Sequence, residues 1–290
     1  MIEVDGVTKQ YGEVTAVRDL SVRIETGEVF GLVGPNGAGK TSTLKMLAGL
    51  VDPTAGRIEV NGRAPSDPQT RAELGFLPEE SSLYDEMTPH SYLHFFADLY
   101  EVPRERAQAR IEETLDRLDL DVRDRPVGDF SKGMMRKVAI ARSLINDPSV
   151  LIYDEPASGL DPVTTNTVVN FTRELAERGK TVLFSAHDLY HVESVCDRIA
   201  IMNEGEIQAI GTLEEIRAAH GSVTYRVFTD VEVDGAKPSG EEFLSTAESM
   251  AAVESVREQA TEAGGTVTDI RSQESSLEDL FLSVTGTRNQ

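Results

Sequence analysis

The chain has 290 residues, enough for one large domain or for a large domain with a small one beside it. Its formal net charge of −22, from 50 acidic and 28 basic residues, disfavours unassisted binding to the phosphate backbone of nucleic acids. The single cysteine, Cys196, excludes an internal disulfide framework, and we expect it to be a small buried residue in a reducing compartment. The sequence shows neither a secretory signal nor an apolar run long enough to span a bilayer, so we expect no direct bilayer insertion.

The N-terminal segments predict short strands and one helix. Strands are expected at Ile2–Val7, Leu20–Glu25, Glu28–Val33 and Arg57–Asn61. The third strand leads into a glycine-rich loop, Gly34–Thr41, and then into a helix. The apolar face of that helix comprises Leu44, Met46, Leu47 and Leu50.

The middle third of the chain predicts helices. From about Thr88 the apolar residues recur at helical spacing, as in Tyr92, Phe95, Phe96 and Leu99. A later helix begins after Ser131, a residue type that caps helix N-termini. We expect an inserted helical subdomain over about residues 84–146.

Strands and helices then alternate. Val150–Tyr153 is wholly apolar, as in a strand buried on both faces, and Thr181–Ser185 is a second such strand. Between them a helix runs from about Thr164 to Arg178 and ends at Gly179. This alternation predicts an α/β core with a largely parallel sheet.

The last part of the chain predicts a hairpin and then a small separate domain. Asn203-Glu-Gly205 is typical of the turn between two strands. Beyond it we expect a strand from Val223, a helix over about Glu241–Ala263, a strand at Thr266–Ile270 and a last helix that begins with the capping box Ser276-Leu-Glu-Asp279. The expected domains are 1–221 and 222–290.

The loop Gly34–Thr41 matches the pattern G-x-x-x-x-G-K-[ST] between a strand and a helix. Its glycines let backbone N–H groups turn toward a phosphate, and the helix N-terminus adds positive potential. Lys40 can reach the β- and γ-phosphates, and the Thr41 hydroxyl can ligate Mg²⁺. The alternative is a plain glycine-rich turn with a solvated lysine.

Asp154 and Glu155 follow the apolar strand that ends at Tyr153. In a P-loop protein such an aspartate holds Mg²⁺, and the adjacent glutamate polarises the attacking water as a general base. The alternative is an acidic pair at a strand end without a catalytic role.

Further segments identify a family. Gly75-Phe-Leu-Pro-Glu79, Phe130-Ser-Lys-Gly-Met134 and Ser158-Gly-Leu-Asp161 occur in that order around the acidic pair, and His187 follows the strand Thr181–Ser185. With the glycine-rich loop, the set resembles the P-loop, Q-loop, signature, D-loop and H-loop of ABC transporter nucleotide-binding subunits over about residues 1–220. The tail, which contains Leu277-Glu-Asp-Leu-Phe-Leu-Ser-Val-Thr-Gly286, is similar to that of the drug-resistance and sodium-export type.

The resemblance implies an α/β fold with a P-loop NTPase (RecA-like) core, an antiparallel β subdomain, an inserted helical subdomain and a small C-terminal α+β appendage. It implies ATP and Mg²⁺ as cofactors, with Lys40, Glu155 and His187 as catalytic residues and Thr41, Asp154 and Glu79 near the metal. The nucleotide would be bound by Tyr11, Gly34, Pro35, Asn36, Gly37, Ala38, Gly39, Lys40, Thr41, Ser42, Ser131, Gly133 and Asp161. Tyr11 would stack on adenine, whereas Ser131 and Gly133 would contact the γ-phosphate held by the opposite subunit.

Two departures from the family pattern are visible. The signature usually reads Leu-Ser-Gly-Gly-Gln, but here Phe130, Lys132 and Met134 replace its first, third and fifth residues. The Q-loop carries Glu79 where the family has Gln. A carboxylate only accepts hydrogen bonds, so we expect Glu79 to approach the metal without the donor ability of an amide.

The resemblance also implies partners. One P-loop and one signature predict a head-to-tail dimer (a homodimer or a pair with a related ATPase subunit) with two ATP molecules at its interface. A separate transmembrane permease subunit would dock near Glu79–Phe96 and hold the chain peripherally at the cytoplasmic face of the cell membrane, most simply in an exporter. No nucleic-acid partner is expected. The alternatives are a soluble ABC ATPase that acts on ribosomes or DNA and a non-catalytic regulatory cassette.

The acidic composition has a second interpretation. Seven Lys against 21 Arg, with acidic residues spread over both expected domains, would fit a halophile-like protein in a salt-rich cytoplasm, where screening relieves self-repulsion. In such a cytoplasm acidity alone would no longer exclude nucleic-acid partners. The argument against such partners then depends on the single-cassette architecture.

Overall fold

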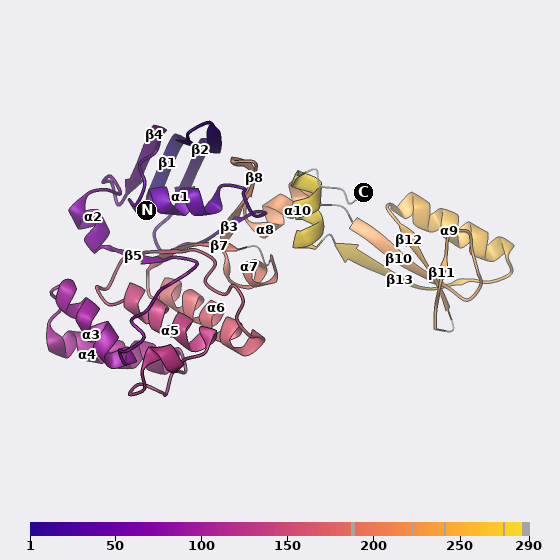
Figure 1. The fold of residues 1–290 in the computed structure, drawn as a ribbon. Helices are drawn as coiled ribbons and strands as arrows, with labels where there is room; N and C mark the ends of the chain where they lie inside the picture. The colour runs from indigo at the N-terminus through magenta and orange to yellow at the C-terminus, as the bar shows by residue number, and fades with distance from the viewer. Residues whose placement is uncertain (187–188, 222, 241, 275, 286–290) are drawn as a thin grey trace. The chain divides into compact units, whose positions relative to one another are not determined.

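The chain divides into two compact units, Met1–Thr212 and Leu213–Gln290. The computed structural model describes residues 1–186, 189–221, 223–240, 242–274 and 276–285, and Figure 1 labels most of its elements. The division by contacts falls before helix α8 (Leu213–His220). The expected domain boundary after residue 221 remains a prediction.

Six of the described strands of the first unit form one sheet, in the order β5-β6-β7-β3-β8-β9. All neighbours in it run parallel except β9, which pairs antiparallel with β8. Three of the central strands are buried along their whole length, which confirms the largely parallel core expected from the apolar runs. The strand bounds are β3 Val29–Val33, β5 Leu74–Leu77, β6 Val150–Tyr153, β7 Thr181–Ala186, β8 Arg198–Asn203 and β9 Glu206–Gly211.

A smaller antiparallel sheet has the order β2-β1-β4, with β1 at Ile2–Tyr11, β2 at Val14–Ile24 and β4 at Ala55–Val60. The first two strands are longer than the sequence predicts, because register shifts interrupt the alternation of buried and exposed residues along β1. The core of the unit joins both sheets to the first helix, α1 (Lys40–Leu47). It includes Ile2, Leu20, Phe30, Leu44, Leu47 and Ile152.

Helices surround the larger sheet (Figure 1), and α3, α4 and α5 confirm the helices expected in the middle of the chain. These three helices pack against one another. The hydroxyl of Ser131 accepts a hydrogen bond from the backbone N–H of Met134 at 3.3 Å, which confirms the predicted cap of α5. The helix bounds are α2 Pro68–Ala72, α3 Pro89–Leu99, α4 Arg104–Arg117, α5 Lys132–Ser143, α6 Pro162–Glu177 and α7 Leu189–Val195, with a 3₁₀ turn at Val127–Asp129.

The second unit is an α+β structure. Its described strands form an antiparallel sheet in the order β11-β12-β10-β13, and α9 packs on β10 and β12 around buried Val227, Ala247 and Val253. Helix α8 contacts the last helix, α10. The bounds are β10 Val223–Thr229, β11 Lys237–Ser239, β12 Glu242–Ala247, α9 Met250–Glu262, β13 Val267–Glu274 and α10 Leu277–Thr285.

One prediction for this unit was wrong: the segment Glu241–Ala263 is not a single helix. Its first part is strand β12, where Ser245 and Ala247 are buried and Thr246 is exposed. The helix begins only after Ser249, whose hydroxyl accepts a hydrogen bond from Ala252 N–H at 3.2 Å. The segment forms a strand and not a helix because its small buried side chains let α9 pack closely on the sheet.

Candidate functional site

The P-loop connects the buried strand β3 to helix α1. Gly37 and Gly39 have φ angles of 84° and 101°, in the left-handed region that favours glycine. A side chain on Gly39 would place its Cβ 2.4 Å from the carbonyl oxygen of Ala16. Gly39 is also the N-cap of α1 and supplies no side-chain cap, so the first backbone N–H groups of the helix have no capping side chain and are available to an anion.

Lys40 is a buried cation, only 6% exposed, at the start of α1. Its Nζ donates hydrogen bonds to the carbonyl oxygens of Gly34 at 2.7 Å and Pro35 at 3.2 Å. The same Nζ lies 3.7 Å from Oε1 of Glu155. The ammonium group therefore lies among loop carbonyls and beside the carboxylate that the sequence predicts as the general base.

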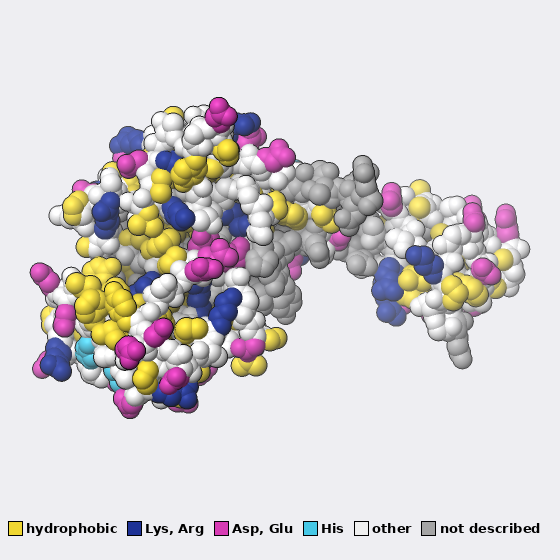
Figure 2. Space-filling model, viewed as in Figure 1, with side chains coloured by type: hydrophobic (Ala, Val, Ile, Leu, Met, Phe, Trp, Pro, Cys, Tyr) yellow, Lys and Arg dark blue, Asp and Glu magenta, His cyan; other side chains and the backbone are white. Residues whose placement is uncertain are grey.

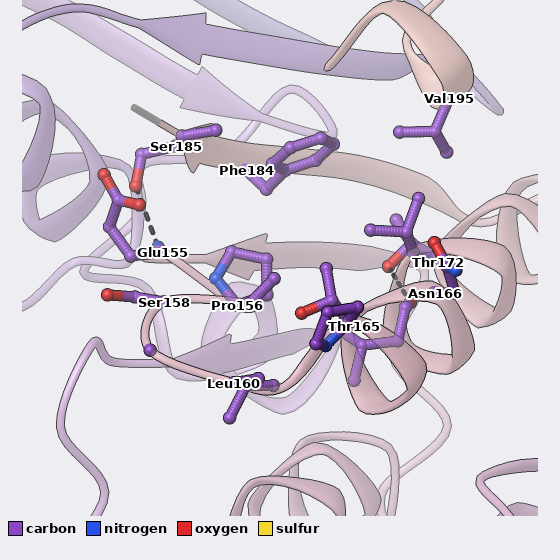
Figure 3. Close-up of a pocket in the computed structure, with 16 residues that line it drawn as sticks. Glu155, Pro156, Ser158, Leu160, Thr165, Asn166, Thr172, Phe184, Ser185 and Val195 are labelled. Carbon is purple, nitrogen blue, oxygen red and sulfur yellow. Dashed lines mark hydrogen bonds between the residues drawn. The ribbon is translucent and has the colours of Figure 1, made fainter. Parts of the chain in front are cut away.

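The acidic pair follows strand β6, and both side chains are buried, at 2% exposed for Asp154 and 8% for Glu155. Ser185, at 0% exposed near the end of the neighbouring strand β7, joins the two residues. Its hydroxyl donates to Oδ1 of Asp154 at 2.6 Å. It also accepts from the backbone N–H of Glu155 at 3.0 Å, the bond drawn between these two residues in Figure 3. The serine therefore fixes the Asp154 carboxylate relative to the Glu155 backbone.

A cavity of about 500 Å³ brings most of the predicted nucleotide residues together. Besides the P-loop, its lining includes Glu79 from the Q-loop and Glu155, so the loop amides, one cation and two carboxylates face the same space. The lining comprises Ala16, Pro35, Asn36, Gly37, Ala38, Gly39, Lys40, Thr41, Ser42, Glu79, Glu155 and Ser158.

A second cavity, of about 370 Å³, adjoins the first and shares Glu155 and Ser158 with it (Figure 3). It lies between the D-loop segment, α6 and the end of β7, and Leu160 and Phe184 are among its lining residues. A hollow therefore borders the D-loop.

Other predicted residues lie outside the lining of the first cavity. Tyr11 is 45% exposed, with the Lys9 ammonium 5.0 Å from its ring centre. Ser131 is exposed at the N-terminus of α5, and Gly133 is buried against Thr164, with 3.1 Å from a would-be Cβ to that side chain. His187 lies outside the described residues.

Asp161 has a structural role in this chain. It caps α6: one carboxylate oxygen accepts from the backbone N–H groups of Val163 and Thr164, at 3.1 and 3.0 Å. The Thr164 hydroxyl donates to the other oxygen at 2.7 Å, and these bonds hold the pKa of Asp161 below its ordinary value. Its predicted contact with nucleotide remains a prediction.

Sequence reasoning missed two residues of this region, Ser185 and Arg136. A polar residue in the otherwise apolar strand Thr181–Ala186 was a signal for Ser185. No comparable signal marked Arg136, because its buried environment comes from segments far away in the chain.

Comparisons with known proteins agree with this geometry. A sequence model of ABC transporters matches residues 17–158. The ABC transporter ATP-binding protein NatA of Bacillus subtilis is 43% identical over 208 residues, which cover 70% of this chain and 84% of NatA. The linearmycin resistance ATP-binding protein LnrL of Bacillus subtilis is 33% identical over an alignment of 308 positions, which covers 99% of this chain and 98% of LnrL.

A solved structure agrees as well. A dimeric ATP-binding cassette in a post-hydrolysis state, bound to ADP and Pi, is 26% identical with a TM-score of 0.66, and the match covers 73% of this chain and 99% of that cassette. The likeness extends from the P-loop NTPase core to the antiparallel and helical parts of the first unit, as predicted. With one relative matching along nearly its whole length and a P-loop beside an acidic strand end, the chain belongs to the family of ABC transporter ATP-binding proteins.

Proposed function

We propose that the chain drives transport by hydrolysing ATP in the P-loop cavity, with Lys40 binding the phosphates and Glu155 activating water. As a member of its family the chain is an ATPase. The observation that carries the assignment of residues is the shared lining of one cavity by the P-loop, Lys40, Glu79 and Glu155. The intact cation and carboxylates favour hydrolysis over a non-catalytic regulatory role.

Mg²⁺ is the proposed cofactor. The Thr41 hydroxyl and the Glu79 carboxylate border the cavity, and Asp154 lies beside it at the end of β6. Among the described residues no three His, Cys, Asp or Glu side chains are grouped to hold a metal ion without help. That fits Mg²⁺, which prefers oxygen donors and takes several of them from phosphates and water; when bound, it neutralises charge on the β- and γ-phosphates.

Hydrolysis needs a water aligned with the γ-phosphate and a base for its proton. Glu155 borders the cavity, and its backbone N–H is held by Ser185, so its carboxylate can take that proton while the water oxygen bonds to phosphorus and ADP leaves. Lys40 and the loop amides stabilise the phosphate charge. His187 is the second residue proposed to position the water.

The site is proposed to be completed by a second copy of the chain. Ser131 and Gly133 do not line the cavity of their own chain, and Ser131 is exposed at a helix N-terminus. A head-to-tail dimer would bring this signature over the partner's nucleotide, with Asp161 nearby, while the exposed Tyr11 ring offers a surface for adenine. The solved relative bound to ADP and Pi is dimeric.

A membrane subunit is the second proposed partner. Among the described residues, no helix combines the length and apolarity needed to cross a bilayer. Exposed apolar side chains gather on and near α3 (Figure 2), including Tyr84 at 55% exposed and Leu99 at 62%. A hollow of about 420 Å³, lined by Leu50, Phe96 and other residues, lies beside them. We assign this surface to a permease that holds the chain at the cytoplasmic membrane face; the name of LnrL favours export.

The substitution Glu155→Gln tests the assignment of the base. It removes the proton acceptor and keeps the shape of the side chain, so kcat for ATP should fall about a hundredfold or more while the Kd for ATP changes less than about threefold. Steady-state phosphate release and nucleotide titration measure the two quantities.

Glu28→Gln is the matched control. Glu28 is also 8% exposed and also ion-paired, with Arg198 at 3.0 Å, but it does not line the cavity. It should retain kcat within about threefold of the unmodified chain, because only an ion pair outside the site is lost. Undiminished hydrolysis by Glu155→Gln would refute the role of Glu155.

A further inference from the structure

Arg136, on helix α5, donates hydrogen bonds from all of its side-chain N–H groups to backbone carbonyls of two other segments. The side chain is buried, at 8% exposed. Nη1 donates to the carbonyl oxygens of Pro78 at 2.7 Å and Glu79 at 2.9 Å. Nη2 donates to those of Asp154 and Glu155, both at 2.8 Å, and Nε donates to that of Pro156 at 2.9 Å. A guanidinium has five N–H groups, and here each has a carbonyl partner.

The five carbonyls lie just beyond the ends of β5 and β6, where the ladder between these parallel strands stops. A buried carbonyl without a donor is unfavourable, so the guanidinium takes the place of the missing strand partner for both segments at once. One side chain therefore joins the Q-loop, the acidic strand end and the helix that begins at the signature.

The charge of Arg136 is compatible with this burial. Burial lowers the pKa of Arg136 to about 10, opposed by Tyr153 and by the carboxylates of Asp154, Glu79 and Glu155. The group therefore stays protonated at neutral pH. Its positive charge also offsets the mutual repulsion of those three carboxylates.

The hydrogen bond from Arg136 supports a strained backbone conformation at Glu155. Its φ angle is 48°, in the left-handed region that non-glycine residues avoid and that persists only where surrounding contacts hold it. Ser185 holds the N–H of this residue and Arg136 holds its carbonyl oxygen. The direction of the Glu155 side chain thus depends on a hydrogen bond that originates in α5.

We propose that Arg136 is a positioning residue that couples the orientation of the signature helix to the backbone of Glu79 and Glu155. This inference rests on the proposed function, because it assumes that Glu155 activates water and that the signature contacts a partner's nucleotide. A shift of α5 when the signature engages that nucleotide would move the guanidinium. The five carbonyls would follow, and the alignment of Glu155 would improve when the partner's nucleotide is in place.

Arg136→Lys and Arg136→Gln test the coupling, with Lys137→Gln as the matched control. Lys137 is the next residue of α5, is 9% exposed and also donates to a backbone carbonyl, that of Asp119 at 3.2 Å, but this carbonyl lies outside the site. We expect kcat for ATP to fall about a hundredfold in both Arg136 variants, because small misplacements of a catalytic group have effects of this size, with KM changed less than about threefold. Lys137→Gln should keep kcat within about threefold.

A double substitution separates positioning from a general loss of stability. If Arg136 acts through Glu155, Arg136→Lys combined with Glu155→Gln should hydrolyse ATP at the rate of Glu155→Gln alone. Multiplied losses would overturn the proposal, and so would an Arg136→Lys variant as active as Lys137→Gln. If the unmodified chain hydrolyses ATP and Glu155→Gln retains only a small measurable rate, either of these results refutes the coupling and leaves the proposed function intact.

A measurement on the unmodified protein covers the case in which the Arg136 variants do not fold. Hydrogen exchange of amides over 132–136 and over 154–158 should slow together as the dimer forms with a non-hydrolysable ATP analogue, because one side chain ties the two segments. Protection of one segment at nucleotide concentrations that leave the other unchanged would also overturn the proposal.

Discussion

At the residue scale, the Lys40 ammonium group already has partners. It donates to two carbonyls of its own loop and lies 3.7 Å from Glu155, so the proposed binding of ATP phosphates would compete with these contacts. The sequence motif predicts which residue binds the phosphates. The motif cannot predict the contacts of Lys40, because Glu155 follows a strand that lies more than a hundred residues later in the chain.

Cys196 is partly buried, whereas the sequence predicts a fully buried residue. A Cβ added to Gly31 would lie 2.8 Å from its sulfur, so the thiol packs closely against strand β3. Burial raises the pKa of this thiol above its ordinary value. At pH 8 the thiolate fraction is therefore lower than in an unfolded chain.

We predict that Cys196 of the folded protein resists thiol reagents. At pH 8 its reaction with Ellman's reagent should be at least about a hundredfold slower than in the chain unfolded by guanidinium, since both the thiolate fraction and access are reduced. The absorbance of the released thiolate follows both reactions. Similar rates in the two states would show that the thiol is accessible and contradict this packing.

At the element scale, the P-loop depends on one backbone approach. Gly39→Ala would bring a Cβ within 2.4 Å of the Ala16 carbonyl oxygen at a φ angle of 101°. The loop must shift, so the N–H groups proposed to face the phosphates lose their alignment, and the Kd for ATP should rise at least about tenfold in a calorimetric titration.

Gly179→Ala is the matched control for this substitution. Gly179 also has a positive φ angle, 86°, at the C-terminal end of α6, but nothing lies within 4 Å of a would-be Cβ. It should carry a similar backbone strain without a change in ATP affinity. Equal Kd values for Gly39→Ala and the unmodified chain would contradict the proposed role of the loop.

Most elements could be predicted from the sequence where neighbouring residues determine how a helix or turn begins or ends. The capping box of α10 is confirmed: the backbone N–H of Ser276 donates to Asp279 at 3.0 Å, and that of Asp279 donates to the Ser276 hydroxyl at 3.1 Å. The hairpin turn at Asn203-Glu-Gly205 and the helix end at Gly179 are confirmed as well. These features depend on neighbouring residues only.

What could not be predicted depends on contacts between distant segments. The sequence predicts a helix where strand β12 lies, because the contacts that favour the strand come from α9 and from pairing with β10. Likewise, the roles of Ser185 and Arg136 arise only when β5, β6, β7 and α5 meet at one edge of the sheet. The sequence predicts the chemistry of the candidate site from its motifs, whereas the network that positions the acidic pair needs the fold.

At the scale of the whole molecule, a complete ATP site is proposed to need two copies of the chain. The first unit holds a cavity with P-loop and carboxylates, while the exposed Ser131 lies outside the lining of that cavity. If the signature acts on the partner's nucleotide, a defect in the P-loop and a defect in the signature can be carried by different copies and still leave one intact site.

Mixing two inactive variants is the most direct test. Lys40→Ala removes the phosphate-binding cation, and Ser131→Arg blocks the signature; each should be inactive alone. In an equimolar mixture half of the dimers pair the two variants and hold one intact site each, so ATPase activity should recover to at most about a quarter of that of the unmodified protein. The proposed coupling through Arg136 would lower this value, because the Glu155 of the intact site belongs to the chain whose signature is blocked. A mixture that stays as inactive as its components would contradict a composite site and show that each chain must complete its own.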